Sequence, residues 1–199
     1  MNHASQARAA RQPHAAIADH FVNRWSPRAM SGDPLTDAEI AMLFEAARWA
    51  PSAFNSQPWR FVYARRDTPQ WGPLFGLLGE KNQRWVKHGA LLVVVLSTAT
   101  DPTGKVLRTH TFDAGAAWEN IALQASAMGL VIHGMQGFDY DRARSELQVP
   151  EQMTVEATFI VGRPGSVADL PEDLQEREKP SQRRPVAEFA FEGALPAVS

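Results

Sequence analysis

A short polar segment organises this chain: Ala50-Pro51-Ser52-Ala53-Phe54-Asn55-Ser56-Gln57-Pro58-Trp59-Arg60-Phe61. A helical pattern runs into it from Thr36, and a strand-like run leaves it at Trp59. Pro51 ends the helix near Trp49, because proline lacks an amide donor and disfavours helix at the residue before it. The hydroxyl and amide side chains in between can both donate and accept hydrogen bonds, so they suit the edge of a heterocyclic ligand. An ordinary turn rich in turn-forming residues explains the same composition.

Length and composition indicate a soluble globular domain. The 199 residues are enough for one domain with a sizeable core, with 44% hydrophobic and 21% charged residues. A net charge of -2 argues against a general binder of nucleic-acid backbones. The chain has no cysteine, which excludes disulfides, thiolate metal sites and cysteine nucleophiles and fits a cytoplasmic protein. The longest apolar run, Ala90 to Leu96, is too short to span a membrane.

The hydrophobic patterns mix helices and strands, which predicts an α+β or three-layer domain. Thr36 and Glu39 form a capping box at the start of a helix. The valine-rich run 91–96 predicts a strand buried on both faces. From Thr111 to Leu130 the chain is small or apolar on nearly every side, which predicts a helix at the centre of the domain or across a subunit interface. Further patterns predict helices over 17–25, 71–78 and 139–147 and strands over 60–64 and 154–161.

The two ends of the chain differ from this central part. Residues 1–16 are rich in alanine and arginine, and we interpret them as a flexible N-terminal extension rather than a transit peptide. Beyond Gly162 the chain is polar and rich in proline, which favours an arm laid over a surface. The apolar residues Val186, Phe189 and Phe191 in this arm favour burial against a partner.

Three polar clusters carry the functional signal: Arg24/Ser26/Arg28, Ser52/Asn55/Gln57 and Arg183/Arg184. Arginines that flank a serine suit a phosphate, because the guanidinium group offers a bidentate fork and serine adds a donor. Solvated surface arginines remain the alternative for each cluster taken alone. The chain has no GxSxG, HExxH or P-loop motif, no GxGxxG follows a strand, and the six histidines lack metal-ligand spacing.

Taken in order, these segments resemble the FMN-dependent nitroreductase family. Arg24-Trp25-Ser26-Pro27-Arg28 is similar to its RxSxR signature, and the segment 50–61 is similar to its APSxxNxQPWxF segment. The softer motifs that follow in the family's order are Asn82-Gln83-Arg84-Trp85, Asp113-Ala114-Gly115, Ala127-Met128-Gly129-Leu130, Gly134-Met135-Gln136-Gly137-Phe138-Asp139 and Arg183-Arg184-Pro185. The resemblance covers roughly residues 21–191.

The resemblance implies an FMN site. It assigns the cluster at 24–28 and one of the two late arginines, with Arg183 favoured, to the phosphate and ribityl side. It places the cluster at 52–57 by the ribityl chain and the ring, contributed by the other subunit. Asn82 is expected at the pyrimidine edge of the flavin ring. The segment 134–137 is expected along the other face of the ring, with a backbone amide near the flavin atom N5. The implied set is Arg24, Trp25, Ser26, Arg28, Pro51, Ser52, Asn55, Gln57, Asn82, Gly134, Met135, Gln136, Gly137, Arg183 and Arg184.

The resemblance also implies a fold and an activity. The expected fold is a three-layer α+β sandwich with a central mixed or antiparallel sheet, in an intertwined homodimer. Residues 17–199 are expected to form one domain, with the arm 163–199 packed on the partner subunit. The expected reaction is ping-pong hydride transfer from NADH or NADPH through FMN to a nitroaromatic, a quinone or a similar acceptor, with no catalytic side chain.

Gln136 departs from the family pattern, because many members have a glutamate there. Glutamine keeps the hydrogen bonding and removes a charge, which leaves nicotinamide positioning and substrate range open. Alternatives within this interpretation are a flavin-binding or storage protein without turnover, and a same-fold enzyme of flavin fragmentation or reductive dehalogenation. The sequence has no ribose-reading motif that decides between NADH and NADPH, and it does not identify the physiological acceptor.

Overall fold

The protein folds around a four-stranded antiparallel sheet. A computed structural model describes residues 3–196. The strands are β1 (Trp59–Arg65), β2 (Leu91–Thr98), β3 (Val131–Met135) and β4 (Met153–Gly162), and their order across the sheet is β1-β2-β4-β3. The central strands pair with Leu91 opposite Val161, and all neighbouring strands are antiparallel. Of the two sheet types expected, the structure therefore has the antiparallel one.

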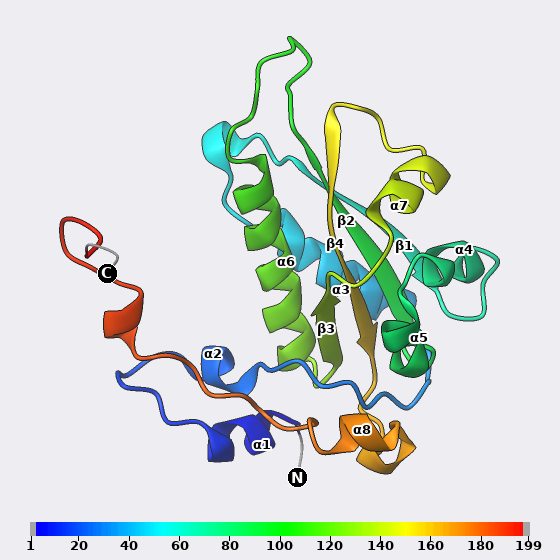
Figure 1. The fold of residues 1–199 in the computed structure, drawn as a ribbon, viewed down its shortest axis with the longest axis vertical. Helices are drawn as coiled ribbons and strands as arrows, with labels where there is room; N and C mark the ends of the chain where they lie inside the picture. Colours follow the sequence, from blue (N-terminus) through cyan, green and yellow to red (C-terminus); the bar gives the residue numbers. More distant parts are fainter. Residues whose placement is uncertain (1–2, 197–199) are drawn as a thin grey trace.

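Helices cover both faces of the sheet and make three layers (Figure 1). On one face lie α3 (Asp37–Arg48) and the long α6 (His110–Ala127). On the other lie α4 (Trp71–Gly76), α5 (Glu80–Val86), α7 (Tyr140–Glu146) and α8 (Glu172–Gln175). Alternate residues of β2 enter the two cores, so this strand is buried on both faces, as the apolar run predicted.

Helix α6 is only partly covered within the chain. Ala117 and Ile121 are fully buried against the sheet, whereas Phe112 near the start of the helix is 79% exposed. The small residues of the helix explain the close packing, because they let the helix backbone approach the sheet. Coverage of its exposed side by a partner stays a prediction.

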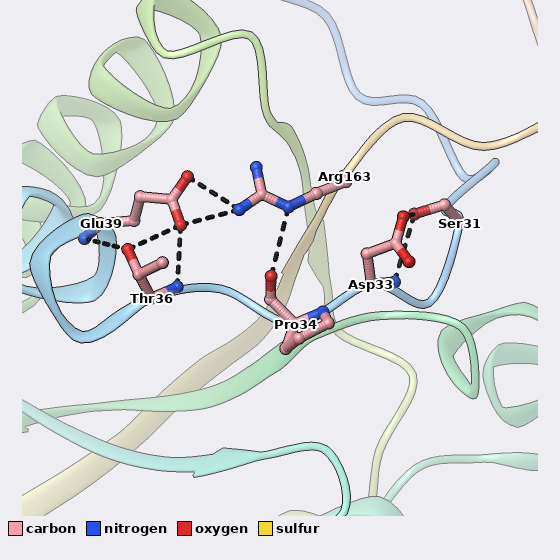
Figure 2. A network of polar contacts seen from close by, with 6 residues as sticks. All are labelled: Ser31, Asp33, Pro34, Thr36, Glu39 and Arg163. Atoms are coloured by element: carbon pink, nitrogen blue, oxygen red, sulfur yellow. Dashed lines mark hydrogen bonds and ion pairs between the residues drawn. The ribbon is translucent and has the colours of Figure 1, made fainter.

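Helix α3 is fixed at its start by a polar network (Figure 2). The Thr36 hydroxyl accepts a hydrogen bond from the Glu39 backbone N–H, and the Glu39 carboxylate accepts one from the Thr36 N–H at 2.8 Å. Arg163, just after β4, donates to both Glu39 oxygens at 3.0 and 2.9 Å and to the carbonyl of Pro34. The predicted capping box is confirmed, and Arg163 also ties it to the sheet.

The N-terminal segment and the C-terminal arm run side by side at one end of the sheet (Figure 1). The N-terminal segment contains α1 (His3–Ala10) and α2 (Asp19–Asn23), and the arm contains the short helices η2 (Val167–Asp169) and η3 (Val186–Glu188). Arg11 Nε donates to the carbonyl of Ser181 at 3.1 Å, and Gln182 Nε2 donates to that of Ala10 at 2.6 Å.

Residues 3–10, within the extension that we expected to be flexible, form a helix, and Ala7 in it is buried. The flexibility expected for 1–16 stays a prediction, as does the packing of the arm on a partner. Residues 1–2 and 197–199, which belong to these two expected segments, lie outside the described part. None of the helices within residues 3–196 is long and apolar enough to cross a lipid bilayer.

Candidate functional site

Six cationic side chains surround a cavity of about 250 Å³ at the junction of the two terminal segments. We call this cavity the arginine pocket; it is lined by Arg11, Arg24, Trp25, Ser26, Arg28, His133, Arg177, Lys179, Ser181 and Arg183. The whole chain carries a net charge of -2, so this concentration of positive charge is a local feature. Guanidinium groups and serine hydroxyls bind oxyanions well, and the pocket therefore suits a phosphate.

The backbone that carries these arginines is held from the C-terminal arm. Glu178 is buried, and its carboxylate accepts hydrogen bonds from the backbone N–H groups of Arg28 at 2.5 Å and Ala29 at 2.8 Å. The same carboxylate lies 3.8 Å from the Arg28 guanidinium. From the other side, Arg11 donates to the carbonyls of Val22 at 2.8 Å and Arg24 at 2.6 Å. These contacts fix the segment 24–29 before any ligand binds.

The charges in the pocket are only partly balanced. Arg24 lies 3.6 Å from Glu119 on α6, and its guanidinium also donates to the Ser26 hydroxyl at 3.3 Å. Burial lowers the pKa of Arg11, and the nearby Arg183 and Arg24 lower it further. Burial also lowers the pKa of Arg28, against the opposing attraction of Glu178. Crowded, partly desolvated cations favour the binding of an anion that relieves their repulsion.

His133 from β3 closes the floor of the pocket as a neutral ring. Its Nδ1 donates to the carbonyl of Pro27 at 3.1 Å, and its ring lies 4.8 Å from that of Trp85. Burial, followed by the nearby charge of Arg28, lowers the pKa of His133 to about 4. At neutral pH this side chain therefore orients the segment 24–28 and adds no charge to the pocket.

The segment after His133 forms a second cavity of about 480 Å³, lined in part by Gly134, Met135 and Gln136 together with Trp118. A Cβ atom at Gly134 would lie 3.0 Å from the Trp118 ring. At Gly137 it would lie 2.8 Å from the amide nitrogen of Asn82, which donates to the Gly137 carbonyl at 3.0 Å. The two glycines thus allow a close approach of the Trp118 and Asn82 side chains, and the structure brings Asn82 beside the segment 134–137. The contacts of these residues with FMN stay a prediction.

The loop after Pro51 is strained and exposed. It contains the short helix η1 (Ala53–Asn55), and φ is positive at Phe54 (52°), Asn55 (55°) and Gln57 (46°). Such angles are uncommon for residues with a side chain, and strained backbone tends to gather at functional sites. The Ser52 hydroxyl accepts from the Gln57 N–H at 3.0 Å, and the Phe54 side chain is fully exposed.

Within one chain, this loop does not meet the arginine pocket. The Ala53 N–H donates to Asp113 in the first turn of α6, whereas α2, which leads into the arginine pocket, lies at the other end of that helix (Figure 1). The half-buried Ser52 and the exposed Asn55 and Gln57 therefore lie apart from the residues that line the arginine pocket.

The structure also distinguishes the two late arginines. Arg183 lines the arginine pocket, whereas Arg184 lines only a neighbouring cavity of about 300 Å³ that also contains Ile17, Phe21 and Val186. Trp25 is buried and donates from Nε1 to the carbonyl of His3 at 3.2 Å, so it supports the pocket. Sequence reasoning missed Arg11, His133, Arg177, Lys179 and the buried Glu178, since none of them belongs to a recognisable motif.

Comparisons with known proteins agree with this geometry. Residues 22–70 match the model of the nitroreductase family. A putative NADH dehydrogenase/NAD(P)H nitroreductase of Rhodopseudomonas palustris is 30% identical over 139 residues, which cover 60% of this chain and 70% of the relative. A solved oxidoreductase containing FMN superposes with a TM-score of 0.90 at 43% identity, covering 94% of this chain and 97% of its own.

A putative nitroreductase from Desulfovibrio desulfuricans, solved in complex with FMN, has a TM-score of 0.70 at 25% identity and covers 89% of this chain and 96% of its own. The fold is thus that of FMN-containing oxidoreductases. The chain belongs to the nitroreductase family.

Proposed function

We propose that this protein is an FMN-dependent oxidoreductase that uses NADH or NADPH to reduce a nitroaromatic, a quinone or a similar acceptor. The observation that carries the proposal is the arginine pocket, whose His133 is followed on β3 by Gly134, Met135 and Gln136, which line the second cavity. A phosphate site near a cavity with room for a flat ring is the arrangement that a mononucleotide cofactor needs. The putative reductase names of the relatives support the same activity.

The residues present fit FMN. Arg24, Ser26, Arg28 and Arg183 would hold the phosphate, because their donors line one small cavity. Gly134, Met135 and Gln136 line the cavity of about 480 Å³ in which the ring would lie, and Asn82 stands beside Gly137. Of the set that the resemblance implied, Arg184 is the member whose position fits the phosphate least.

We further propose a homodimer in which the loop at 52–57 of one chain completes the FMN site of the other. This assignment accounts for two observations: the loop is strained and exposed, and it lies away from the arginine pocket of its own chain. It also accounts for the uncovered side of α6 and for the exposed Val186 and Phe189 of the arm. The cysteine-free composition fits action in the cytoplasm.

When bound, FMN would supply the redox chemistry by taking a hydride from NAD(P)H and passing it to the acceptor. The chain's part is to bind, orient and balance charge. The cations of the arginine pocket hold the phosphate, and amide donors along 134–137 favour negative charge on the ring. Gln136 adds a neutral hydrogen-bonding group to the cavity rather than a negative charge.

The deciding experiment is the absorbance spectrum of the purified protein, followed by anaerobic titration with NADH and then NADPH. Flavin bands that bleach with either donor support the proposal and identify the donor. Bands that remain oxidised with both donors indicate a flavin-binding protein without this turnover. A protein that contains no flavin and takes up none when FMN is added refutes the proposal.

A further inference from the structure

The half-buried carboxylate of Glu156 lies beside the proposed ring cavity, at an irregularity of β4. Val95 pairs with Ala157 and the next residue, Leu96, pairs with Val155, so Glu156 between them has no partner on β2. This extra residue is a β-bulge, and bulges redirect side chains and occur often beside active sites. Val155 accordingly packs in the core on the α4 and α5 side, whereas regular alternation from Phe159 would place it on the α6 side.

The bulge directs the Glu156 carboxylate toward the start of α6, where it ends a chain of hydrogen bonds. Its Oε1 accepts a very short hydrogen bond from the Ser97 hydroxyl and one of 3.0 Å from the Thr111 hydroxyl. His110 Nδ1 lies 2.6 Å from the same Ser97 oxygen and 3.6 Å from Glu156 Oε1. The Ser97 side chain is fully buried, and those of His110 and Glu156 are only 17% and 15% exposed.

This chain of groups has a cavity near each of its ends. Glu156 and Thr111 line the cavity of about 480 Å³ that also contains Gly134 and Gln136. At the other end, residues next to Ser97 and His110, namely Thr98 and Thr109, line a separate cavity of about 850 Å³. All contacts of this network fall on Oε1 of Glu156, so Oε2 remains for a molecule in the smaller cavity.

The charges around Glu156 are few. From α6, His110 faces it directly, and Asp113 one turn further is engaged by Ala53 and Thr109. From β2 the facing group is the neutral Ser97, and the end of β3 presents Gly134 and Gln136, which carry no charge. Within the described residues, His110 is thus the titratable group that a hydrogen-bonded side chain, Ser97, links to Glu156.

We propose that Glu156 donates a proton to the electron acceptor and that Ser97 and His110 restore it from solvent. This proposal rests on the proposed function, because it assigns a catalytic residue to that reaction. With a quinone as acceptor, the hydride that originates from NAD(P)H forms one O–H bond of the product. The Glu156 O–H bond breaks and its proton forms the other, so hydroquinone leaves and a carboxylate remains. His110 Nδ1 donates to the Ser97 oxygen while the Ser97 hydroxyl proton passes to Glu156, and His110 regains a proton from solvent.

Two acceptors separate this role from a structural one. A quinone needs a proton as well as electrons, whereas ferricyanide takes single electrons and no proton. We expect Glu156→Gln to slow anaerobic reoxidation by a quinone by roughly 10²-fold, the scale of one general acid, and to leave reoxidation by ferricyanide unchanged. Ser97→Ala, which interrupts the restoring path, should slow the quinone reaction over repeated turnovers. The matched control is Glu151→Gln, at an exposed position before β4.

A second readout does not depend on turnover. Negative charge on the reduced cofactor favours protonation of a neighbouring carboxylate. Hydride transfer from NAD(P)H itself takes no proton from solvent, so proton uptake during reduction reports on protonation of groups in the protein. Reduction in weakly buffered solution with a pH indicator should therefore show more proton uptake per flavin in the wild type and in Glu151→Gln than in Glu156→Gln.

The outcomes also separate this inference from the proposed function. Equal loss of the quinone and ferricyanide reactions in Glu156→Gln, or equal proton uptake in that variant and the wild type, overturns the role of Glu156. A wild-type protein that is not reduced by NADH or NADPH refutes the proposed function itself. A wild type that is reduced by either, together with an unaffected Glu156→Gln variant, refutes only the present inference.

Discussion

Replacing Glu178 with alanine should destabilise the protein and loosen the arginine pocket together. The carboxylate is buried and holds two consecutive backbone N–H groups, those of Arg28 and Ala29. Alanine leaves both donors without a partner and also leaves the Arg28 guanidinium without its nearest anion. The variant therefore tests whether the C-terminal arm organises the segment 24–29 or only lies over it.

The expected loss can be worked from these contacts. A buried donor left without a partner costs about 1–3 kcal/mol, and Ala29 is only 1% exposed, so water cannot replace the lost contact there. The ion pair at 3.8 Å adds less, because the Arg28 side chain is 19% exposed. We expect Glu178→Ala to lose about 3–5 kcal/mol, the range seen when one partner of a buried pair is removed. Glu178→Gln, which keeps an acceptor of the same shape, should lose about 1–2 kcal/mol.

Urea unfolding of the protein freed of any bound flavin measures this loss directly, because a bound ligand adds to the apparent stability. For a chain of this size the alanine variant should also melt roughly 6–20 °C lower. The exposed Glu176 on the same arm supplies the control, since its replacement by alanine should change the free energy of unfolding by less than about 0.5 kcal/mol. A loss below about 1 kcal/mol in Glu178→Ala would refute the reasoning.

Three further predictions follow from the pocket and the cap. Arg183→Ala should lower the amount of FMN retained through purification, as measured by the flavin absorbance of the purified protein, and Arg184→Ala should not. Equal retention in both variants would contradict the assignment of Arg183 to the phosphate. The pKa of His133 is lowered to about 4, so between pH 6.5 and pH 4 the unfolded chain binds more protons than the folded chain. Acidification over this range should therefore lower the free energy of unfolding of the wild type by about 3 kcal/mol more than that of His133→Gln. Parallel pH profiles of the two proteins would contradict the prediction. Hydrogen bonds from the backbone and side chain of Thr36 and then from Arg163 lower the pKa of Glu39, so the contribution of its carboxylate is present above pH 4.5 and lost on further acidification. Glu39→Gln should cost about 1 kcal/mol in urea unfolding at pH 7 and less at pH 3, and a cost that does not depend on pH would count against a role for the charge.

The features that the sequence predicted best depend on neighbouring residues. The capping box needs only Thr36 and Glu39, and the burial of β2 follows from its own run of apolar side chains. The cluster Arg24/Ser26/Arg28 is also local, and the structure places all three side chains in one pocket. In such cases the physical cause lies within a few residues, so a single sequence contains it.

The features that it did not predict depend on distant residues. Glu178 is 150 residues away from Arg28, and nothing around it in the sequence marks it as a buried acceptor. In β4, regular alternation from Phe159 places Glu156 on the α4 and α5 side of the sheet, and only the pairing with β2 shows the bulge that directs it toward α6 instead. The strand β3 was not identified, because its five residues include Gly134 and His133, which weaken the usual strand pattern.

The arginine pocket has a consequence for synthesis of the protein on the ribosome. It needs Arg11, Arg24 and Arg28 from the first part of the chain and Arg177 and Arg183 from the last part described. The whole sheet is translated between these two groups. Because chains emerge N-terminus first, the early arginines remain without Glu178 and the late cations until the sheet has been made. The apolar residues of the sheet are therefore all synthesised before the arginine pocket can form, and a chain interrupted before residue 177 would lack Arg177, Arg183 and the Glu178 carboxylate.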